Sequence, residues 1–341
     1  MADPLLESFQ LKHLHLKNRI ITTSHEPAYN EDGFPKDRYI AYHLERAKGG
    51  IAMTMTAGSA VVSKDSPPSF DNIHAYKDEV VPWIKKLTDT IHDHDCKIMI
   101  QLTHLGRRTS WSKGDWLPSL SSGKHREPAH KAFPKVMESW DIERIIKEYG
   151  DAAERMKEGG MDGVELEGQG HLIGQFLSPL TNELSTEYGG SLENRLRFTI
   201  DVLSDIRKKV GQDFIVGIRC VFDEVEEGGI TKSEGLKIAK ILSDSGLVDY
   251  LNVNKGRIHT DPILTKHIPI QGMKSAPHLE FAGEIKKEIQ LPIFHASKIS
   301  DVATARYAIS NGLVDMIGMT RGHLADPHIV TKIKEKREED I

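Results

Sequence analysis

The chain contains little cysteine, no long apolar run and no large excess of charge of either sign. Only Cys96 and Cys220 occur among its 341 residues, which excludes the dense disulfide framework of small secreted proteins. Both cysteines fall in or beside predicted strands. We therefore expect them to be small buried apolar side chains rather than a redox pair.

Charge, hydropathy and the N-terminus exclude further classes of protein. The formal net charge of -5 gives no overall attraction for nucleic acid, and no stretch approaches the ~18 apolar residues of a membrane span. Residues 1–4 lack the basic and apolar regions of a signal peptide. These features favour a cytoplasmic protein in a reducing compartment, whose partner is a small-molecule substrate rather than nucleic acid or a membrane.

What the chain does have is a regular alternation of short β-branched runs with longer amphipathic segments. The apolar run 214–218 is typical of a strand buried on both faces. Eight such βα units predict a parallel (β/α)₈ TIM barrel rather than a doubly wound sheet, and one barrel accounts for the whole length. The predicted strands lie near 19–24, 51–57, 97–103, 162–167, 214–219, 248–253, 292–295 and 314–318.

Two segments fall outside the repeating units. Residues 5–17 precede the first strand and are predicted to form a hairpin that closes the floor of the barrel. Between Leu102 and Asp141, after the third strand, the chain makes an insertion rich in proline and serine. It is too long for an ordinary connection, so it predicts a lid over the C-terminal face, with a passive surface excursion as the alternative.

Residues 187–198, Glu-Tyr-Gly-Gly-Ser-Leu-Glu-Asn-Arg-Leu-Arg-Phe, form the most informative stretch. Gly189 and Gly190 predict a tight turn, and Ser191 an N-cap for a helix that runs to about Lys209. As a whole, the stretch resembles the signature of the old yellow enzyme family of FMN-dependent barrels, which includes dienoyl-CoA reductases and trimethylamine dehydrogenase. The resemblance spans nearly the whole chain and implies an FMN-dependent oxidoreductase.

Polar residues at the carboxyl ends of the strands are the candidate ligands of that cofactor. Residues 101–107 read Gln-Leu-Thr-His-Leu-Gly-Arg and resemble the family's Gln-Leu-x-His-x-Gly-Arg, in which the glutamine amide reads the flavin pyrimidine edge. Arg219 ends the fifth strand, and a cation in the barrel mouth needs an anion. The resemblance implies that Arg219 stabilises the charge that appears at N1 and O2 as hydride reaches N5; the alternative is a salt bridge.

The segments after the last two strands are the candidate phosphate site. Ala296, Ser297 and Lys298 follow the seventh strand, and Thr320 and Arg321 follow the eighth, where barrels commonly hold phosphate through backbone amides and cations. The resemblance implies the FMN phosphate. The family usually has glycines before these cations, so Ala296 and Thr320 are departures, and solvated surface charges are the alternative.

The first strand leads into a segment whose backbone, in the family, lies along the flavin. Thr23 and Ser24 stand where the commonest family form has Ala-Pro. Glu26 stands where relatives carry Cys, Thr or His near the reactive side of the flavin. An acid there would tune the flavin or touch the substrate, unless it forms a buried pair with an arginine or lysine.

The stretch after the fourth strand departs from the ene-reductases of the family. Residues 165–172 read Glu-Leu-Glu-Gly-Gln-Gly-His-Leu, which puts Glu167 at the usual first His, Gln169 near the usual second donor and His171 at the usual Tyr. An ionised carboxylate only accepts hydrogen bonds. Glu167 would therefore repel the enolate of alkene reduction and attract a cation.

Residues 167–176 and 25–29 resemble N-methylproline or betaine-type demethylases more than ene-reductases. This predicts oxidation of an N-methyl amine or amino acid, in which Glu167 anchors the ammonium and accepts its proton. His171 would assist that proton transfer or hold a substrate carboxylate. A pairing of Glu167 with an arginine or lysine is the structural alternative. An NAD(P)H-dependent ene-reductase or dienoyl-CoA reductase, and a flavin-free phosphate-binding barrel, are the functional alternatives.

The mode of flavin reoxidation is left open. Multidomain relatives use an iron–sulfur cluster held by closely spaced cysteines beyond the barrel, and this chain contains no such group. We interpret residues 1–341 as a single FMN-binding domain or the N-terminal part of a longer enzyme, with an electron-transfer domain or protein and a homo-oligomer both open. No metal is expected, because the run 92–95, His-Asp-His-Asp, is predicted away from the catalytic face.

Overall fold

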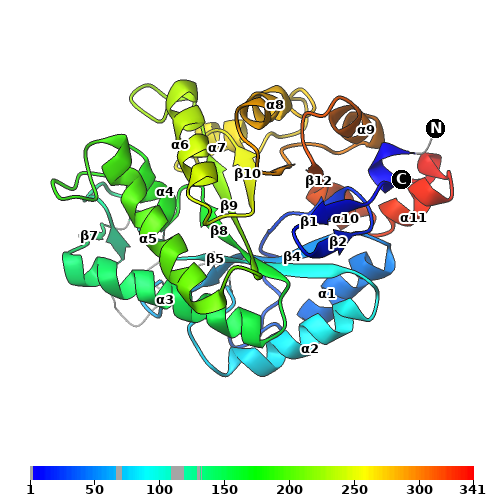
Figure 1. Cartoon of the computed structure of the whole chain (residues 1–341), viewed down its shortest axis with the longest axis horizontal. Helices are drawn as coiled ribbons and strands as arrows, with labels where there is room; N and C mark the ends of the chain where they lie inside the picture. The colour runs from blue at the N-terminus through cyan, green and yellow to red at the C-terminus, as the bar shows by residue number, and fades with distance from the viewer. Residues whose placement is uncertain (1–2, 67–70, 109–118, 129–130, 132) are drawn as a thin grey trace.

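The computed structural model describes residues 3–66, 71–108, 119–128, 131 and 133–341. Eight parallel strands close into a barrel in the order β10-β11-β12-β3-β4-β5-β8-β9 (Figure 1). The prediction of a (β/α)₈ barrel is thus confirmed, and each barrel strand overlaps a predicted one. The strands are β3 Ile20–Thr22, β4 Met53–Val61, β5 Lys97–Thr103, β8 Gly163–Gly168, β9 Ile215–Val221, β10 Tyr250–Asn254, β11 Ile293–His295 and β12 Met316–Gly318.

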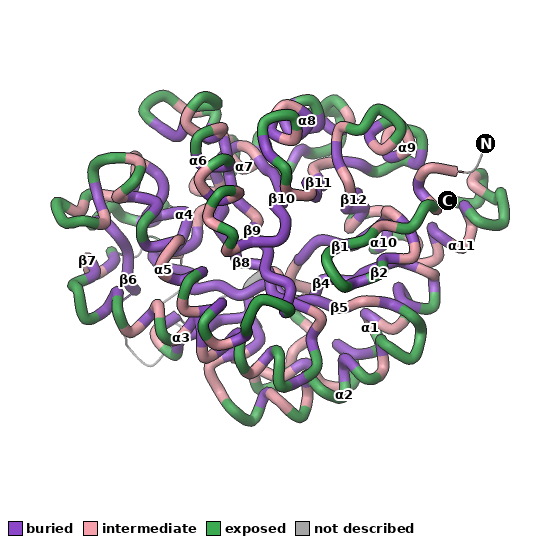
Figure 2. The backbone as a smooth tube through the Cα atoms, viewed as in Figure 1, coloured by how far each residue is buried: buried purple, intermediate pink, exposed green. Residues whose placement is uncertain are grey.

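Helices surround the barrel, and their inner faces are buried while their outer faces are exposed (Figure 2). This is the one-sided pattern expected where amphipathic helices cover a parallel sheet. The α-helices are α1 Asp37–Lys48, α2 Val80–His92, α3 Ser139–Glu158, α4 Leu172–Leu177, α5 Leu192–Val210, α6 Lys232–Asp244, α7 Asp261–His267, α8 Leu279–Glu288, α9 Val302–Ser310, α10 Thr320–Ala325 and α11 Ile329–Lys334, with short 3₁₀ helices at Pro4–Leu6 and Glu338–Asp340.

The signature segment forms the predicted turn and helix start. Gly190 has a φ of 82°, and the Ser191 hydroxyl accepts a hydrogen bond from the backbone of Asn194 at 3.3 Å, which caps α5. Arg195 then donates to the carbonyl oxygens of Leu177 at 2.9 Å and Gly190 at 2.6 Å. The segment therefore fixes α5 against α4, whose N-terminus faces the barrel mouth.

The N-terminal hairpin closes the barrel floor, as predicted. Strands β1 Phe9–Leu11 and β2 Leu14–Leu16 pair antiparallel. Leu11, Leu14 and Leu16 are buried in one cluster with side chains from the barrel interior, including Met99 and Phe294. Each fully buried leucine contributes roughly 1.5–3 kcal/mol, so the hairpin stabilises the end of the barrel opposite the strand carboxyl ends.

The insertion after β5 is only partly within the described residues. Its described part forms strands β6 Leu120–Ser121 and β7 Lys135–Val136. The Ser121 hydroxyl donates to Gln175 Oε1 at 3.0 Å, and the Ser122 hydroxyl donates to the Gln175 carbonyl at 2.7 Å. This part rests on α4, whereas residues 109–118 lie outside the described residues, so a lid stays a prediction.

The structure also places the two cysteines and the run 92–95 that the sequence analysis discussed. Cys96 and Cys220 are both buried and unpaired. His92 Nε2 lies 2.8 Å from Asp162 Oδ2, and the described residues contain no group of three His, Cys, Asp or Glu side chains that could hold a metal. None of the described helices is both long and apolar enough to cross a bilayer.

Candidate active site

A cavity of about 450 Å³ lies at the carboxyl ends of the barrel strands, within the range of roughly 300–1,000 Å³ typical of small-molecule and cofactor sites. The structure brings every predicted site residue into its wall. These residues are Thr23, Ser24, Glu26, Gln101, Glu167, Gln169, His171, Arg219, Ala296, Ser297, Lys298, Thr320 and Arg321.

A buried carboxylate orients the amide of Gln101. Glu165 lies beside Gln101 in the register of β5 and β8 and is fully buried. Its carboxylate accepts hydrogen bonds from Gln101 Nε2 at 2.8 Å and from Tyr250 and Asn252 at 3.0 Å each. Burial raises the pKa of Glu165, and the charge of Arg219 opposes that rise. With one amide hydrogen engaged, Gln101 retains its oxygen and its second hydrogen for a ligand.

Arg219 faces the cavity without an ion pair. It lies beside Glu167 in the register of β9 and β8, yet the described residues form no salt bridge to it. Its Nη1 donates weakly to the Ser24 carbonyl at 3.4 Å. With the Gln169 amide oriented to satisfy both of its ends, the Gln169 oxygen accepts from Arg219 Nε and Asn254 Nδ2 at 2.8 Å, and its nitrogen donates to Glu167 at 3.1 Å. A neutral amide therefore bridges the acid and the guanidinium.

Glu167 and His171 form a close pair at the mouth of β8. His171 Nδ1 lies 3.1 Å from Glu167 Oε2 and 3.0 Å from the hydroxyl of Thr103. Burial raises the pKa of Glu167, but the nearby charges of His171 and Arg219 outweigh burial and hold this pKa below its usual value. Glu167 is therefore ionised at neutral pH. Its Oε2 is buried with no well-aligned hydrogen-bond donor among the described residues, and none of their arginines or lysines forms a salt bridge with it.

Glu26, unlike Glu167, has a raised pKa. Its Oε1 accepts a hydrogen bond from the Ala28 backbone at 3.0 Å, and its buried Oε2 has no partner among the described residues. Burial raises the pKa of Glu26 to about 8, an effect reduced by the Ala28 bond and increased by the charge of Asp71. Glu26 is therefore protonated at neutral pH and is available as a hydrogen-bond donor. The described residues give it no arginine or lysine partner.

The opposite end of the cavity is cationic and conformationally strained. Ser297 and Lys298 have φ values of 77° and 58°, a conformation that costs a non-glycine residue of order 1–3 kcal/mol. Lys298 Nζ donates to the Met273 carbonyl, and Arg321 Nη1 donates to the Pro269 carbonyl at 2.8 Å. The described residues supply no carboxylate to either cation, so this end attracts an anion.

The two departures from the family pattern have local structural roles. The Thr320 hydroxyl accepts from the Thr23 backbone at 2.9 Å and joins the ends of β12 and β3. Ala296 packs close to Gly318, where an added Cβ would come within 2.9 Å of the Ala296 Cβ and 2.6 Å of Thr23 Cγ2. Small side chains are required at this seam, which agrees with alanine at 296.

The chemistry of the wall fits a flavin mononucleotide. The Ser24 hydroxyl is buried without a partner among the described residues. Together with Gln101 and Arg219 it offers donors and an acceptor suited to the polar edge of a heteroaromatic ring. Lys298 and Arg321 offer positive charge suited to a phosphate.

Some cavity residues were not predicted from the sequence. His25 bonds through Nε2 to the Tyr42 hydroxyl, and burial lowers its pKa to about 4, so the ring is neutral. Asn254 ends β10, so the rule that found Arg219 would have found it as well. His267 comes from α7, an extra helix after β10 that no strand-end rule reaches. Glu165 was missed because it lies beneath the cavity wall.

The model of the NADH:flavin oxidoreductase / NADH oxidase family matches residues 4–340. The chain belongs to this family. Membership confirms the resemblance to enzymes of the old yellow enzyme type and the prediction of a flavin-type oxidoreductase at the level of the family. It also implies flavin binding, which weighs against the flavin-free alternative.

Two curated proteins are similar to this chain over almost its whole length. The chain is 66% identical over 339 residues to a protein of Rhizobium meliloti (strain 1021) named probable N-methylproline demethylase, covering 99% of this chain and 50% of that protein. It is 46% identical over 340 residues to the multifunctional alkene reductase/demethylase OYE of Caballeronia cordobensis, again covering 99% and 50%. The chain thus spans about half the length of these relatives.

A solved structure confirms the architecture. The chain superimposes on 2-naphthoyl-CoA reductase in complex with 2-naphthoyl-CoA with a TM-score of 0.93 at 27% identity, covering 100% of this chain and 53% of the other.

Proposed function

We propose that this chain binds FMN and oxidises an N-methylated amine or amino acid. Bound FMN would supply the acceptor for a hydride from the N-methyl group, and water would hydrolyse the resulting iminium to formaldehyde and the demethylated amine. The observation that carries the proposal is Glu167, a buried and ionised carboxylate in the cavity wall that forms no salt bridge with an arginine or lysine among the described residues. The name of the relative at 66% identity supports the same substrate class.

Separate parts of the wall would hold the cofactor. Ser24, Gln101 and Arg219 would hold the polar edge of the ring system, and Lys298 and Arg321, with the backbone near them, would hold the phosphate. When bound, FMN supplies the hydride acceptor. The cation of Arg219, which lacks a salt bridge among the described residues, would favour negative charge at the ring edge next to it.

The residues near β8 would then prepare the substrate. A protonated amine cannot release hydride from its methyl group until its nitrogen lone pair is free. Glu167 would bind the ammonium, and Glu167 with His171 would hold the proton that the nitrogen loses. Gln169 bonds to both Glu167 and Arg219, and these two form no salt bridge among the described residues, so the carboxylate is available to the ammonium. Glu26, protonated at neutral pH, adds no second negative charge that would hold the ammonium elsewhere.

Ene-reduction with NAD(P)H remains the second candidate function. It is favoured by the relative at 46% identity, whose name joins alkene reductase to demethylase. Glu167 opposes it, because a carboxylate cannot donate a hydrogen bond to the oxygen on which negative charge develops.

Anaerobic mixing separates these candidates. The flavin-loaded protein is mixed with N-methylproline and, in a second experiment, with NADPH, while the visible absorbance of oxidised flavin is followed. Bleaching by N-methylproline, with formaldehyde released, is the expected result. Bleaching by NADPH alone, with recovery on adding an enone, would establish the ene-reductase instead. A purified protein that neither contains nor takes up flavin would support the flavin-free barrel.

A further inference from the structure

A second, smaller cavity of about 30 Å³ adjoins the large one. Arg108, Gln169 and Ile258 line both, so the two spaces share a wall. Arg107 and Arg257 line only the smaller cavity. Three guanidinium groups thus lie near the part of the main cavity that Gln169 lines. Which of them can bind a ligand depends on the hydrogen bonds and salt bridges that each already forms.

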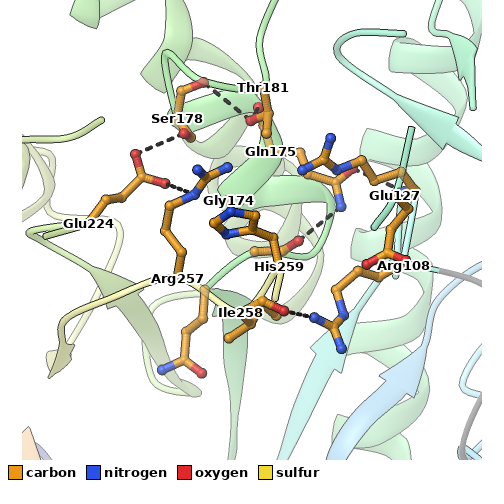
Figure 3. Close-up of a pocket in the computed structure, with 13 residues that line it drawn as sticks. Arg108, Glu127, Gly174, Gln175, Ser178, Thr181, Glu224, Arg257, Ile258 and His259 are labelled. Atoms are coloured by element: carbon orange, nitrogen blue, oxygen red, sulfur yellow. Dashed lines mark hydrogen bonds and ion pairs between the residues drawn. The ribbon is translucent and has the colours of Figure 1, made fainter. Parts of the chain in front are cut away.

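Arg257 is already neutralised. Its Nε lies 3.1 Å from Glu224 Oε1, and its Nη1 lies 2.8 Å from Glu226 Oε2. The hydroxyl of Ser178 donates to the other oxygen of Glu224 at 2.8 Å. Figure 3 shows Arg257 and Ser178 converging on Glu224 from different elements. This network is internally satisfied and has little charge left for a ligand.

Arg107 is turned away from the main cavity. Its Nη1 donates to the carbonyl of His125 at 3.2 Å, within the inserted segment after β5. Arg107 belongs to the Gln-Leu-x-His-x-Gly-Arg motif, and this contact ties the motif to the insertion.

Arg108 is different from both. Its Nη1 donates to the Ile258 carbonyl, as Figure 3 shows, and Ile258 packs over Gly170, where an added Cβ would come within 2.6 Å of it. Nε of Arg108 is buried without a partner among the described residues, and those residues form no salt bridge to the guanidinium. Burial lowers the pKa of Arg108, and the charges of Glu127 and Glu167 oppose that effect.

Among the described residues, Nη1 is the one guanidinium nitrogen of Arg108 with a hydrogen-bond partner, so the edge formed by Nε and Nη2 has none there. This is an edge that can bind a carboxylate through two parallel hydrogen bonds. A partly desolvated guanidinium that forms no salt bridge among the described residues gains free energy when a carboxylate binds to it directly. Arg108 also lies near enough to Glu167 for the two charges to interact.

We propose that Arg108 forms a carboxylate subsite, so that the cavity selects the zwitterion of an N-methyl amino acid over a simple N-methyl amine. The subsite rests on the proposed function for its substrate. Glu167 binds the ammonium and Arg108 binds the carboxylate, and the two together orient the N-methyl group. Arg108 is a specificity residue in this account and takes no part in proton or hydride transfer.

The test compares N-methylproline with N-methylpyrrolidine, which has the same ring and amine but no carboxylate. In Arg108→Gln, the ratio of kcat/KM for the amino acid to that for the amine is expected to fall about 10- to 100-fold, because a charge-assisted bidentate contact is lost. Most of the loss should lie in KM. Arg108→Lys should recover part of the ratio, since charge returns without the planar fork. The matched control is Arg126→Gln, an exposed arginine of the insertion outside both cavities.

A binding measurement makes failure of the subsite distinguishable from failure of the proposed function. L-proline, the demethylated product, is titrated calorimetrically into the flavin-loaded wild type and Arg108→Gln. Weaker binding by the same factor in the variant supports the subsite even if no amine bleaches the flavin. Equal binding of proline to both proteins, or an unchanged kcat/KM ratio, overturns it even if N-methylproline is oxidised.

Discussion

The two ends of the main cavity handle charge in different ways. At the β8 end, each charged side chain is linked to a neighbour through a polar group: Gln169 bridges Glu167 and Arg219, and His171 lies between Glu167 and Thr103. At the β11 and β12 end, Lys298 and Arg321 donate only to carbonyl oxygens among the described residues. A linked network fixes position and protonation, which chemistry requires, whereas cations that lack a carboxylate partner among the described residues provide affinity for an anion.

The largest expected effect comes from breaking the network end. Glu167→Gln preserves shape but removes the charge that binds the ammonium and the base that takes its proton. We expect flavin reduction by N-methylproline to slow by about 10³-fold, within the range for loss of a general base. Stopped-flow absorbance at saturating substrate measures this rate. A loss smaller than about tenfold would mean that the proton leaves by another path.

Changing the cationic end should affect cofactor binding instead. Lys298→Gln and Arg321→Gln should each weaken FMN binding by about 10- to 100-fold, the effect of one charge-assisted contact. Titration of the apoprotein followed by flavin fluorescence gives the dissociation constants. Lys64→Gln, an exposed lysine outside the cavity, is the control. Unchanged FMN affinity in both cavity variants would place the phosphate elsewhere and remove the contrast between the two ends.

Glu165 tests the same comparison from beneath the cavity wall, because its buried side chain lies in β8 next to the linked network. Its negative charge partly offsets the positive potential of Arg219. In Glu165→Gln this offset is lost, so Arg219 should stabilise the negative charge of reduced flavin more strongly. We expect the two-electron potential to rise by roughly 30 mV, equivalent to about 1.4 kcal/mol. Since the pKa of Glu165 is raised, this difference should shrink as pH falls and wild-type Glu165 takes up a proton. Spectroelectrochemical titration at two pH values measures both effects, and a potential that falls in the variant would contradict the assignment.

The smallest effect concerns Glu26 and the stability of the fold. Burial raises the pKa of Glu26 to about 8, so between its unfolded pKa and pH 8 the folded chain holds a proton that the unfolded chain has lost. Stability from this group is therefore present at low pH and is lost as pH rises through about 8. Glu26→Gln should raise Tm relative to wild type by about 2–5 °C at pH 8, with the difference disappearing near pH 4. Calorimetry at both pH values checks this, and an equal difference at both would exclude titration of Glu26 as its cause.

Much of the fold and of the cavity wall could be predicted from the sequence. The eight strands were found because short β-branched runs, as at 214–218, alternate regularly with longer amphipathic segments, which is the pattern of repeated βα units. Parallel strands bring their carboxyl ends to one face, which marked polar residues there, such as Arg219, as candidates, and the family resemblance singled out Gln101 and Glu167. What those residues do in catalysis stays a prediction.

The remaining features of the site depend on tertiary contacts, which the sequence pattern alone does not predict. Glu165 appears as one more polar residue in a strand until the register shows it beside Gln101. Arg108 appears as a neighbour of a motif arginine until the loop after β10 places the Ile258 carbonyl beside it. Likewise, the raised pKa of Glu26 depends on burial by segments distant in sequence. Each is a tertiary effect that depends on side-chain direction and loop path.

The central claim is that an N-methyl carbon gives its hydride to the flavin. Anaerobic single-turnover reduction by N-methylproline, compared with the same amino acid carrying a trideuterated N-methyl group, tests it most directly. The account predicts slower reduction by the deuterated substrate and one formaldehyde released for each flavin reduced. Equal rates for both substrates, or flavin reduction without formaldehyde, would contradict it.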